Sequence, residues 1–261
     1  MSNSNPAFSR SLAFSDSAVR TPDAAALDAL YAKPSATGSD TGRMTYEDTV
    51  MKTLIAFGVL LVGAVVGWVF PVLAIPGLII GLVLALVNIF KKQPSRGLIL
   101  AYAGFEGLFV GGISNIFNTM WNGIVTQAVF GTLAVIGVTL FLFLSGRFRT
   151  SPRMNRIVMV GMVGYLVFSL TNFGLMAFGA TEGMFGLRSY EIFGIPLGVF
   201  IGIFVVFLAA YSLVMDFESI KAGVEKGAPR VYGWQGAFGI MVTVVWLYVE
   251  ILRLLAILRG E

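Results

Sequence analysis

Histidine and cysteine are both absent from this chain of 261 residues. Without cysteine the chain has no disulfide framework, no thiol nucleophile and no thiolate ligand for a metal. Without histidine it has no imidazole to act as a general base or to bind zinc. These absences exclude histidine-dependent serine proteases, H-E-x-x-H zinc proteases and histidine-ligated haem proteins. Any sensing of protons must therefore depend on carboxylates.

Charged residues are also scarce, at 12% of the chain against about 25% in soluble domains. Hydrophobic residues make up 57%, and 31 glycines and 22 phenylalanines accompany only 14 acidic residues. This composition excludes an ordinary soluble domain and is typical of a polytopic membrane protein, whose helices tolerate glycine. A formal net charge of +4 is weak evidence for nucleic-acid binding. We therefore expect the lipid bilayer as a partner and no nucleic acid.

Residues 1–46 differ from the rest of the chain, because serine, alanine, aspartate, threonine and proline dominate there. They contain no apolar run near the start, so we expect no secretory signal peptide. The segment is predicted to be a mostly disordered, cytoplasmic N-terminal tail. It could bind a membrane protein partner, although a solvated tail is the simpler interpretation.

Seven apolar stretches follow, each long enough to cross about 30 Å of hydrocarbon. Their approximate ranges are 53–70, 73–90, 97–117, 123–145, 157–179, 192–215 and 233–257. The sequence therefore predicts an all-α integral membrane protein whose seven-transmembrane-helix bundle occupies residues 47–261.

Basic residues alternate between the loops. Ten follow the even-numbered spans, namely Lys91, Lys92, Arg96, Arg147, Arg149, Arg153, Arg156, Lys221, Lys226 and Arg230. One, Arg188, follows an odd-numbered span. This asymmetry predicts a multi-pass protein of the cell membrane (inner or plasma) with a cytoplasmic N-terminus. The C-terminus would then lie outside, where Arg253 and Arg259 fit poorly, and a re-entrant last segment is the alternative.

Ionisable residues inside spans are costly and are functional candidates by default. Glu106 lies in the middle of the third span and has no local partner, so it is either protonated or paired across helices. Asp216 lies at the inner end of the sixth span, where it could simply be solvated. Glu250 and Arg253 are three residues apart in the last span, so they share a helix face and could neutralise one another.

Glycines recur at four-residue spacing, which lets helix backbones approach closely. The pairs and triplet are Gly63 and Gly67, Gly77 and Gly81, Gly107 and Gly111, and Gly194, Gly198 and Gly202. We interpret them as sites of tight packing within the bundle rather than of dimerisation.

The residue types in this chain argue against several enzymatic functions. An intramembrane aspartyl protease needs two aspartates in the membrane, and only Asp216 lies near a span. No glycine-rich phosphate loop between a strand and a helix is present, since the glycine-rich segments are apolar and helical. We expect the protein not to be an enzyme and to need no cofactor.

Two late segments carry a resemblance to a known family. Residues 211–221 (YSLVMDFESIK) resemble the span-six signature of the Bax inhibitor / YccA family, also called the transmembrane BAX-inhibitor-motif family. Residues 247–255 (LYVEILRLL) resemble its span-seven signature, and residues 105–111 (FEGLFVG) are similar to its third span. The resemblance covers about residues 50–258, and the Asn-Pro-Ala-Phe run at residues 5–8 suggests the bacterial branch.

The resemblance implies a compact bundle in which six helices surround the seventh. Members of the family are linked to pH-sensitive calcium leak, and some to control of a membrane-bound protease or of cell death. In the family, two carboxylates, one in each late span, share a proton and form a pH-dependent latch. The resemblance implies that their counterparts in this chain are Asp216 and Glu250. Possible partners of this gate are Arg253, Glu106, Lys91 and Lys92. Calcium prefers oxygen ligands, so it could bind transiently at Asp216 and Glu250 without a fixed metal site.

The chain departs from the family pattern at the latch. Glu250 stands where the family usually has aspartate, and it lies 34 residues after Asp216. With a turn near residue 229, Glu250 would lie about 30 Å and Asp216 about 20 Å from the turn along their helices. A direct pair would therefore need irregular backbone around Gly233–Gly236. A pair between Glu250 and Arg253 could replace the latch.

Three functions remain open at this point. The first is a pH-sensitive calcium (cation) leak channel gated by intramembrane carboxylates. The second is a non-transporting regulatory membrane protein that modulates a membrane protease or a stress response. The third is a transporter of an unknown solute, for which no coupling-ion motif argues.

Overall fold

The computed structural model of the chain describes Asp28 and residues 42–147, 149–181 and 183–260. Most of the expected tail, and with it the predicted disorder and partner binding, lies outside the described residues. The last tail residues are paired with the rest of the chain. Arg43 forms an isolated antiparallel bridge with Pro229, and the Met44 N–H donates to the Ala228 carbonyl at 2.8 Å. A compact unit therefore begins at Gly42, a few residues before the expected boundary.

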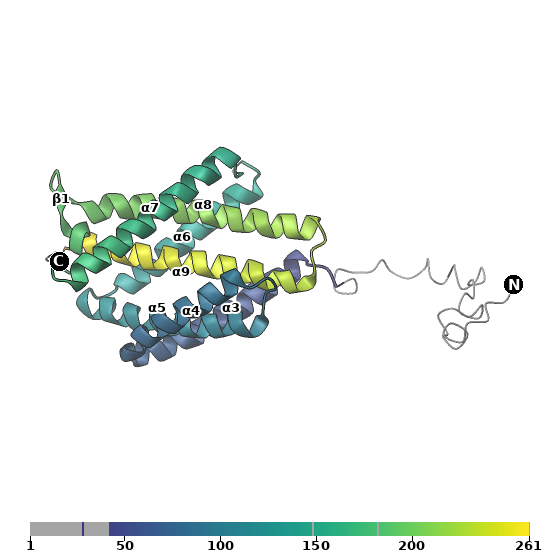
Figure 1. The fold of residues 1–261 in the computed structure, drawn as a ribbon, viewed down its shortest axis with the longest axis horizontal. Helices are drawn as coiled ribbons and strands as arrows, with labels where there is room; N and C mark the ends of the chain where they lie inside the picture. Colours follow the sequence, from purple (N-terminus) through teal and green to yellow (C-terminus); the bar gives the residue numbers. More distant parts are fainter. Residues whose placement is uncertain (1–27, 29–41, 148, 182, 261) are drawn as a thin grey trace, which may run out of the picture. The chain divides into compact units, whose positions relative to one another are not determined.

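Seven long helices make up this unit (Figure 1). They are α3 (Tyr46–Val69), α4 (Ala74–Phe90), α5 (Arg96–Met120), α6 (Ile124–Leu144), α7 (Pro152–Ala177), α8 (Leu197–Glu225) and α9 (Gly233–Leu258). Short 3-10 turns lie at Pro71–Leu73 (η3), Gly186–Ser189 (η4) and Arg230–Tyr232 (η5). Each of the seven helical segments is long and apolar enough to cross a membrane. The prediction of an all-α, seven-span fold is confirmed.

Two helices extend well beyond the apolar stretches that predicted them. α3 begins at Tyr46 rather than near residue 53 because the Thr45 hydroxyl caps it, accepting the Asp48 N–H at 3.2 Å. α8 continues to Glu225 rather than ending near residue 215. Its polar last turns include an exposed ion pair between Lys221 and Glu225. Hydropathy marks the part of a helix that fits hydrocarbon, whereas caps and ion pairs decide where the helix ends.

The connection from α7 to α8 contains η4 and a two-stranded hairpin, β1 (Glu191–Ile192) and β2 (Ile195–Pro196). Its two turn residues, Phe193 and Gly194, have φ angles of 55° and 75°, as a type I′ turn requires. Gly194 therefore serves this turn and not the helix-packing face on which the four-residue spacing placed it.

Glycines bring α3 and α5 into close contact. A Cβ added to Gly67 would collide with the Leu108 carbonyl of α5, and one on Gly111 with the Ala64 carbonyl of α3. Gly63 and Gly107 meet the opposite backbone in the same way. The interpretation of these spacings as tight packing within the bundle is confirmed for this helix pair.

The last helix lies at the centre of the bundle. In Figure 1, α9 runs between α7 and α8 on one side and α3, α4 and α5 on the other. Its side chains are buried from Trp234 near its start to Ile257 near its end. Leu247 and Leu252 belong to a core cluster shared with α6 and α8, and Met241 to a second one shared with α3 and α5. The central position implied by the resemblance is confirmed.

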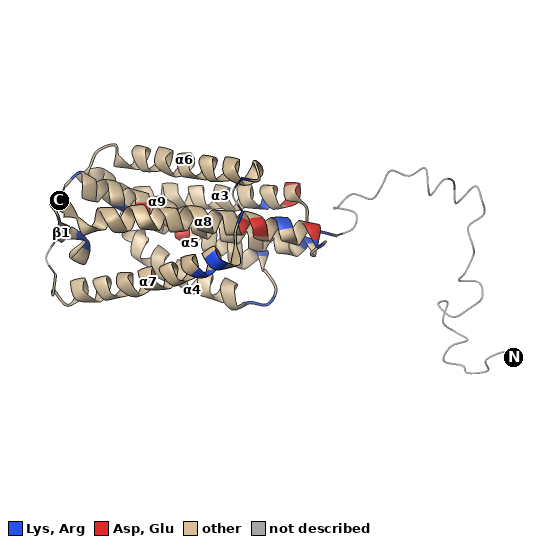
Figure 2. Ribbon diagram, turned by 90° about the horizontal axis from the view of Figure 1, so that it is seen from above, with Lys and Arg blue, Asp and Glu red and all other residues tan. Residues whose placement is uncertain are grey.

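α9 is a single uninterrupted helix, and its two ends lie at opposite ends of the bundle. Near its start, Pro229 pairs with Arg43 ahead of α3. Near its end, the Arg259 guanidinium donates to the Asn122 carbonyl between α5 and α6 at 3.0 Å. A full seventh crossing thus fits the contacts, without a re-entrant turn. Figure 2 shows most charged residues near the helix ends, with few along their middles.

Candidate functional site

Asp216 lies within α8, more than two turns before the helix ends at Glu225. One oxygen, Oδ2, accepts the Thr243 hydroxyl of α9 at 2.7 Å. The other, Oδ1, points at Gly239, where an added Cβ would lie 3.1 Å away. Among the described residues no basic side chain pairs with this carboxylate. Asp216 is therefore an inward-facing carboxylate whose charge no protein cation offsets.

Two cavities meet at Asp216. The first, which we name the end cavity, has a volume of about 450 Å³ and lies beside the α8–α9 connection. Its lining includes Asn88, Asp216, Ser219, Tyr232 and Gln235. The second, which we name the lateral cavity, has a volume of about 620 Å³ and lies between α7, α8 and α9. Its lining is mostly apolar and includes Val158, Met162, Tyr165, Asp216, Thr243 and Trp246. Asp216 thus faces a partly polar space on one side and a mostly apolar space on the other.

Glu250 lies deeper in α9 and is held by three partners. Arg188 Nη1 donates to Oε1 at 2.7 Å, and Arg253 Nη1 donates to Oε2 at 2.7 Å. The Tyr165 hydroxyl of α7 also donates to Oε2 at 2.7 Å and accepts from Arg188 Nη2 at 2.8 Å. We name these four residues the Glu250 cluster. The predicted pairing of Glu250 with Arg253 is confirmed, and two further partners join it.

The Glu250 cluster contains two arginines and a single carboxylate. Side-chain exposure is 4% for Arg188 and 1% for Glu250, so their ion pair is dry. Burial alone would lower the pKa of the Arg188 guanidinium, but the Glu250 carboxylate and the Tyr165 hydroxyl raise this pKa above its ordinary value. Arginine is not deprotonated in proteins, so two guanidinium groups contact one carboxyl group in this cluster.

The α7–α8 connection positions Arg188. The Asn172 side chain accepts the Leu187 N–H at 2.7 Å and donates to the Phe185 carbonyl at 3.2 Å. Gly198 of α8 leaves room for the side chain, since an added Cβ would lie 3.0 Å from the Arg188 Cβ. Arg188 thus enters the bundle from a loop that is itself tied to α7.

The two carboxylates carried over from the family do not form a pair in this structure. Thr243, the partner of Asp216, precedes Glu250 by seven residues, or about 10 Å along α9. α9 is helical from Gly233 onward, so the irregular backbone that a direct pair would need is absent at Gly233–Gly236. The sites lie at different depths, as the count along the two spans indicated.

The remaining candidate partners lie apart from both carboxylates. Glu106 faces α4, where an added Cβ on Gly81 would lie 2.9 Å from its Oε2. Among the described residues Glu106 forms no hydrogen bond or ion pair. Lys91 and Lys92 are exposed in the α4–α5 connection and contact neither Asp216 nor Glu250.

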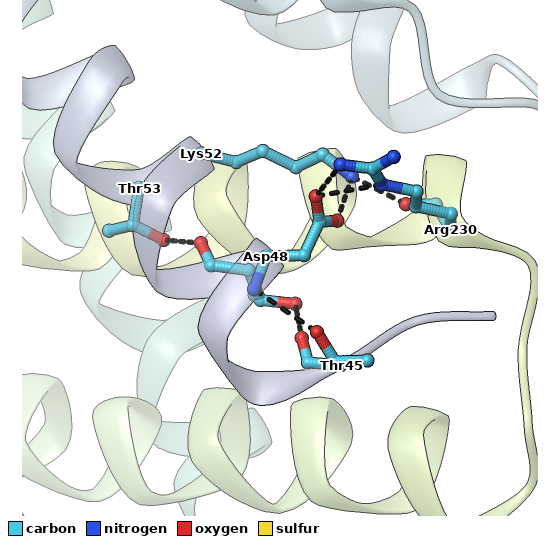
Figure 3. A network of polar contacts seen from close by, with 6 residues as sticks. Thr45, Asp48, Lys52, Thr53 and Arg230 are labelled. Atoms are coloured by element: carbon cyan, nitrogen blue, oxygen red, sulfur yellow. Dashed lines mark hydrogen bonds and ion pairs between the residues drawn. The ribbon is translucent and has the colours of Figure 1, made fainter. Parts of the chain in front are cut away.

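A third ionic group ties α3 to the start of α9 (Figure 3). Asp48 accepts from Lys52 at 2.5 Å and from Arg230 Nη2 at 2.7 Å. Lys52 also donates to the Arg230 carbonyl at 2.6 Å, and its ammonium lies 5.8 Å from the centre of the Trp234 ring. This group was not singled out from the sequence, because Asp48 and Arg230 are 182 residues apart. It closes the end of the bundle beside the end cavity.

No group of three or more histidine, cysteine, aspartate or glutamate side chains within the described part of the chain could hold a metal ion. A protein-family model described as Bax inhibitor 1 like matches residues 5–260, which is almost the whole chain. Neither a curated protein nor a solved structure matches the chain.

Proposed function

We propose, from the premise that this chain belongs to the Bax inhibitor 1 like family, that it is a pH-sensitive cation leak channel with calcium as its permeant ion. The protein would act in the cell membrane with its N-terminus in the cytoplasm, as a channel and not as an enzyme. The observation that carries the proposal is Asp216, an inward-facing carboxylate at the end cavity that has no basic partner among the described residues.

The end cavity offers the chemistry that a partly dehydrated cation needs. Calcium binds oxygen ligands, and Asn88, Ser219 and Gln235 supply side-chain oxygens on the way to Asp216. The Asp216 carboxylate would then take the place of lost water with a full negative charge. Because no arginine or lysine in the described part of the chain pairs with this carboxylate, an ion can bind there and leave again.

The Glu250 cluster would close the path beyond Asp216. Its two ion pairs fill the space between α7, α9 and the α7–α8 connection, so a cation cannot pass while both pairs are formed. For an ion to pass, Arg188 and Glu250 must part. We therefore assign the pH response to Asp216 and the closure to the Glu250 cluster, so the two carboxylates act in series rather than as one pair.

Calcium flux into proteoliposomes from pH 6 to pH 8 tests the proposal, with the wild type beside Asp216→Asn and Glu250→Gln. Protonation removes the charge that attracts the ion, so wild-type flux should fall on acidification. Asp216→Asn should give a low flux that does not change with pH. Glu250→Gln weakens the ion pairs of the closure and should raise the flux while leaving its pH dependence in place.

Glu225→Gln is the matched control, because it removes a carboxylate from an exposed ion pair on α8, the helix that carries Asp216. It should behave as the wild type does. Flux equal to that of empty liposomes at every pH would overturn the proposal. The regulatory role, in which the protein modulates a membrane protease or a stress response without transport, would then take its place.

A further inference from the structure

α7 forms one wall of the lateral cavity and is tied to its neighbours by hydrogen bonds near its start, at its middle and near its end. At its start, the Tyr211 hydroxyl of α8 donates to the Asn155 side chain at 2.5 Å. Further along, Tyr165 joins the Glu250 cluster and Asn172 ties the α7–α8 connection. Between the first two of these attachments Val158 packs against Leu208 and Tyr211 of α8, while Met159, Met162 and Val163 line a space of about 620 Å³.

This space has the dimensions and composition of a small-molecule site. Pockets for drug-sized ligands have volumes of about 300–1,000 Å³ and combine apolar walls with a few polar groups. Here the polar groups include the Asp216 carboxylate, the Thr243 hydroxyl and the Ser169 hydroxyl. Ser169 Oγ is buried without a hydrogen-bond partner. The aromatic rings of Trp246 and Tyr165 complete the wall at 6.0 Å from one another.

Charge decides which kind of ligand fits. Asp216 has one hydrogen bond, from Thr243, and no basic partner among the described residues, so a cation is missing from this side. A hydrated inorganic ion does not suit the methionine and valine walls, and an anion would be repelled by the carboxylate. A neutral acyl chain would cover the half-buried carboxylate of Asp216 without compensating its charge. A compound with an ammonium group on an apolar body fits both the carboxylate and the apolar walls. The ring of Trp246 can also attract the ammonium group.

We propose that the lateral cavity binds hydrophobic ammonium compounds, with the cationic nitrogen at Asp216 and the apolar body between α7, α8 and α9. The ligand would reach the site from the hydrocarbon of the membrane. Met159, Val163 and Leu166 of α7 line the cavity and are also exposed on the outer surface, which acyl chains cover in a membrane. Binding does not depend on ion flux, so this inference stands independently of the channel.

Calorimetric titration of the full chain in phosphatidylcholine nanodiscs tests the inference. The probe is octyltrimethylammonium, with octanol as the uncharged compound of equal chain length and empty nanodiscs as the background. We expect saturable binding of the ammonium compound and none of octanol. Asp216→Asn keeps the Thr243 hydroxyl occupied but removes the charge, and should weaken binding about tenfold or more.

Two further variants separate charge from shape. Glu225→Gln removes a carboxylate of α8 outside the cavity and should bind as the wild type does. Ser169→Phe replaces an unpaired hydroxyl with a ring that occupies the cavity, and should weaken binding although Asp216 is intact. Thermal unfolding of each variant checks that it is folded. Binding of equal strength in the wild type and Asp216→Asn, or no binding above empty nanodiscs, would overturn the inference.

Discussion

Asp216 and Glu250 are carboxylates of the same bundle, but their charges are offset in different ways. Glu250 is 1% exposed and contacts two arginines. Asp216 has a single hydroxyl donor, Thr243. Removing a partner from a buried ion pair leaves the other charge without compensation. Asp216 is half-buried, and removing its charge leaves no unpaired partner charge behind. Substitutions at the two positions should therefore change stability in opposite directions.

Glu250→Leu should destabilise the protein by roughly 3–5 kcal/mol, because Arg188 would stay buried without a counter-charge. Thermal unfolding in detergent measures the effect. Lys221→Gln breaks an exposed ion pair and serves as the control, with an expected change below about 1 kcal/mol. Equal unfolding temperatures for the two variants would show that the Glu250 cluster does not support the fold.

Asp216→Asn should leave the stability unchanged or raise it by roughly 1–3 kcal/mol, because it removes the desolvation cost of a charge and keeps an acceptor for Thr243. The same unfolding experiment measures this change. Thr243→Val, which deletes the donor and leaves the carboxylate, should lower stability. A loss of stability in Asp216→Asn would contradict the absence of a cation beside this carboxylate.

At the residue scale, the sequence predicted only the contacts that helical spacing brings together. Glu250 and Arg253 were predicted to pair because they lie three residues apart. Arg188 and Tyr165 precede Glu250 by 62 and 85 residues, so no local spacing points to them. One signal was present, since Arg188 is the single basic residue that follows an odd-numbered span. A basic residue in a set of loops that otherwise contain none is a candidate for a buried pair.

The contact between α3 and α5 shows how helix pairs are specified at the element scale. Backbones in this pair approach so closely that a Cβ on Gly111 would meet the Ala64 carbonyl of α3. Rotation of a side chain cannot relieve this collision, because the backbone fixes the position of the Cβ and the atom that it meets is a backbone carbonyl oxygen. Small residues at these positions are therefore a requirement of the packing.

Gly111→Val should destabilise the bundle by about 1–3 kcal/mol or more, since a larger residue must separate α3 from α5. Gly137→Val is the matched control, because an added Cβ at Gly137 of α6 has no atom within 4 Å. The yield of monodisperse protein and its unfolding temperature check the comparison. A Gly111→Val protein as stable as Gly137→Val would mean that the two helices can move apart at little cost.

All seven helices were predicted from hydropathy, while their ends were predicted less well. α3, α7 and α8 each include polar residues outside the apolar stretch. In α7 the Ser151 hydroxyl accepts the Met154 N–H at 3.2 Å and Pro152 occupies the first turn. Such caps stabilise a helix outside the hydrocarbon, where hydropathy carries no signal.

At the scale of the whole molecule, the described residues contain seven candidate spans, an odd number. If all seven cross the membrane, the start of α3 and the end of α9 lie on opposite sides of it. Arg253 and Arg259 fitted poorly with an outside C-terminus when they were counted as free charges. In the structure Arg253 pairs with Glu250, and Arg259 donates to Asn122 and Gln127. Basic residues that are used inside the fold do not report on topology as free loop charges do.

The absence of cysteine makes this topology simple to measure, since any introduced cysteine is the only thiol. Lys92→Cys lies between α4 and α5, and Asn122→Cys between α5 and α6; both positions are exposed. In intact cells, a membrane-impermeant maleimide should label Asn122→Cys and reach Lys92→Cys only after the cells are opened. Labelling of both positions from the same side would contradict the crossing of α5.

The central place of α9 sets the order in which the molecule can be completed during synthesis. Ribosomes make the chain from its N-terminus, so six helices emerge before the one that they surround. The α3–α5 contact is local in the chain and can form early. The faces that will meet Leu247 and Leu252 have no partner until the last thirty or so residues arrive. A nonsense mutation before Gly233 would therefore leave six helices without the central helix that they pack against. We expect quality-control proteases to degrade this product.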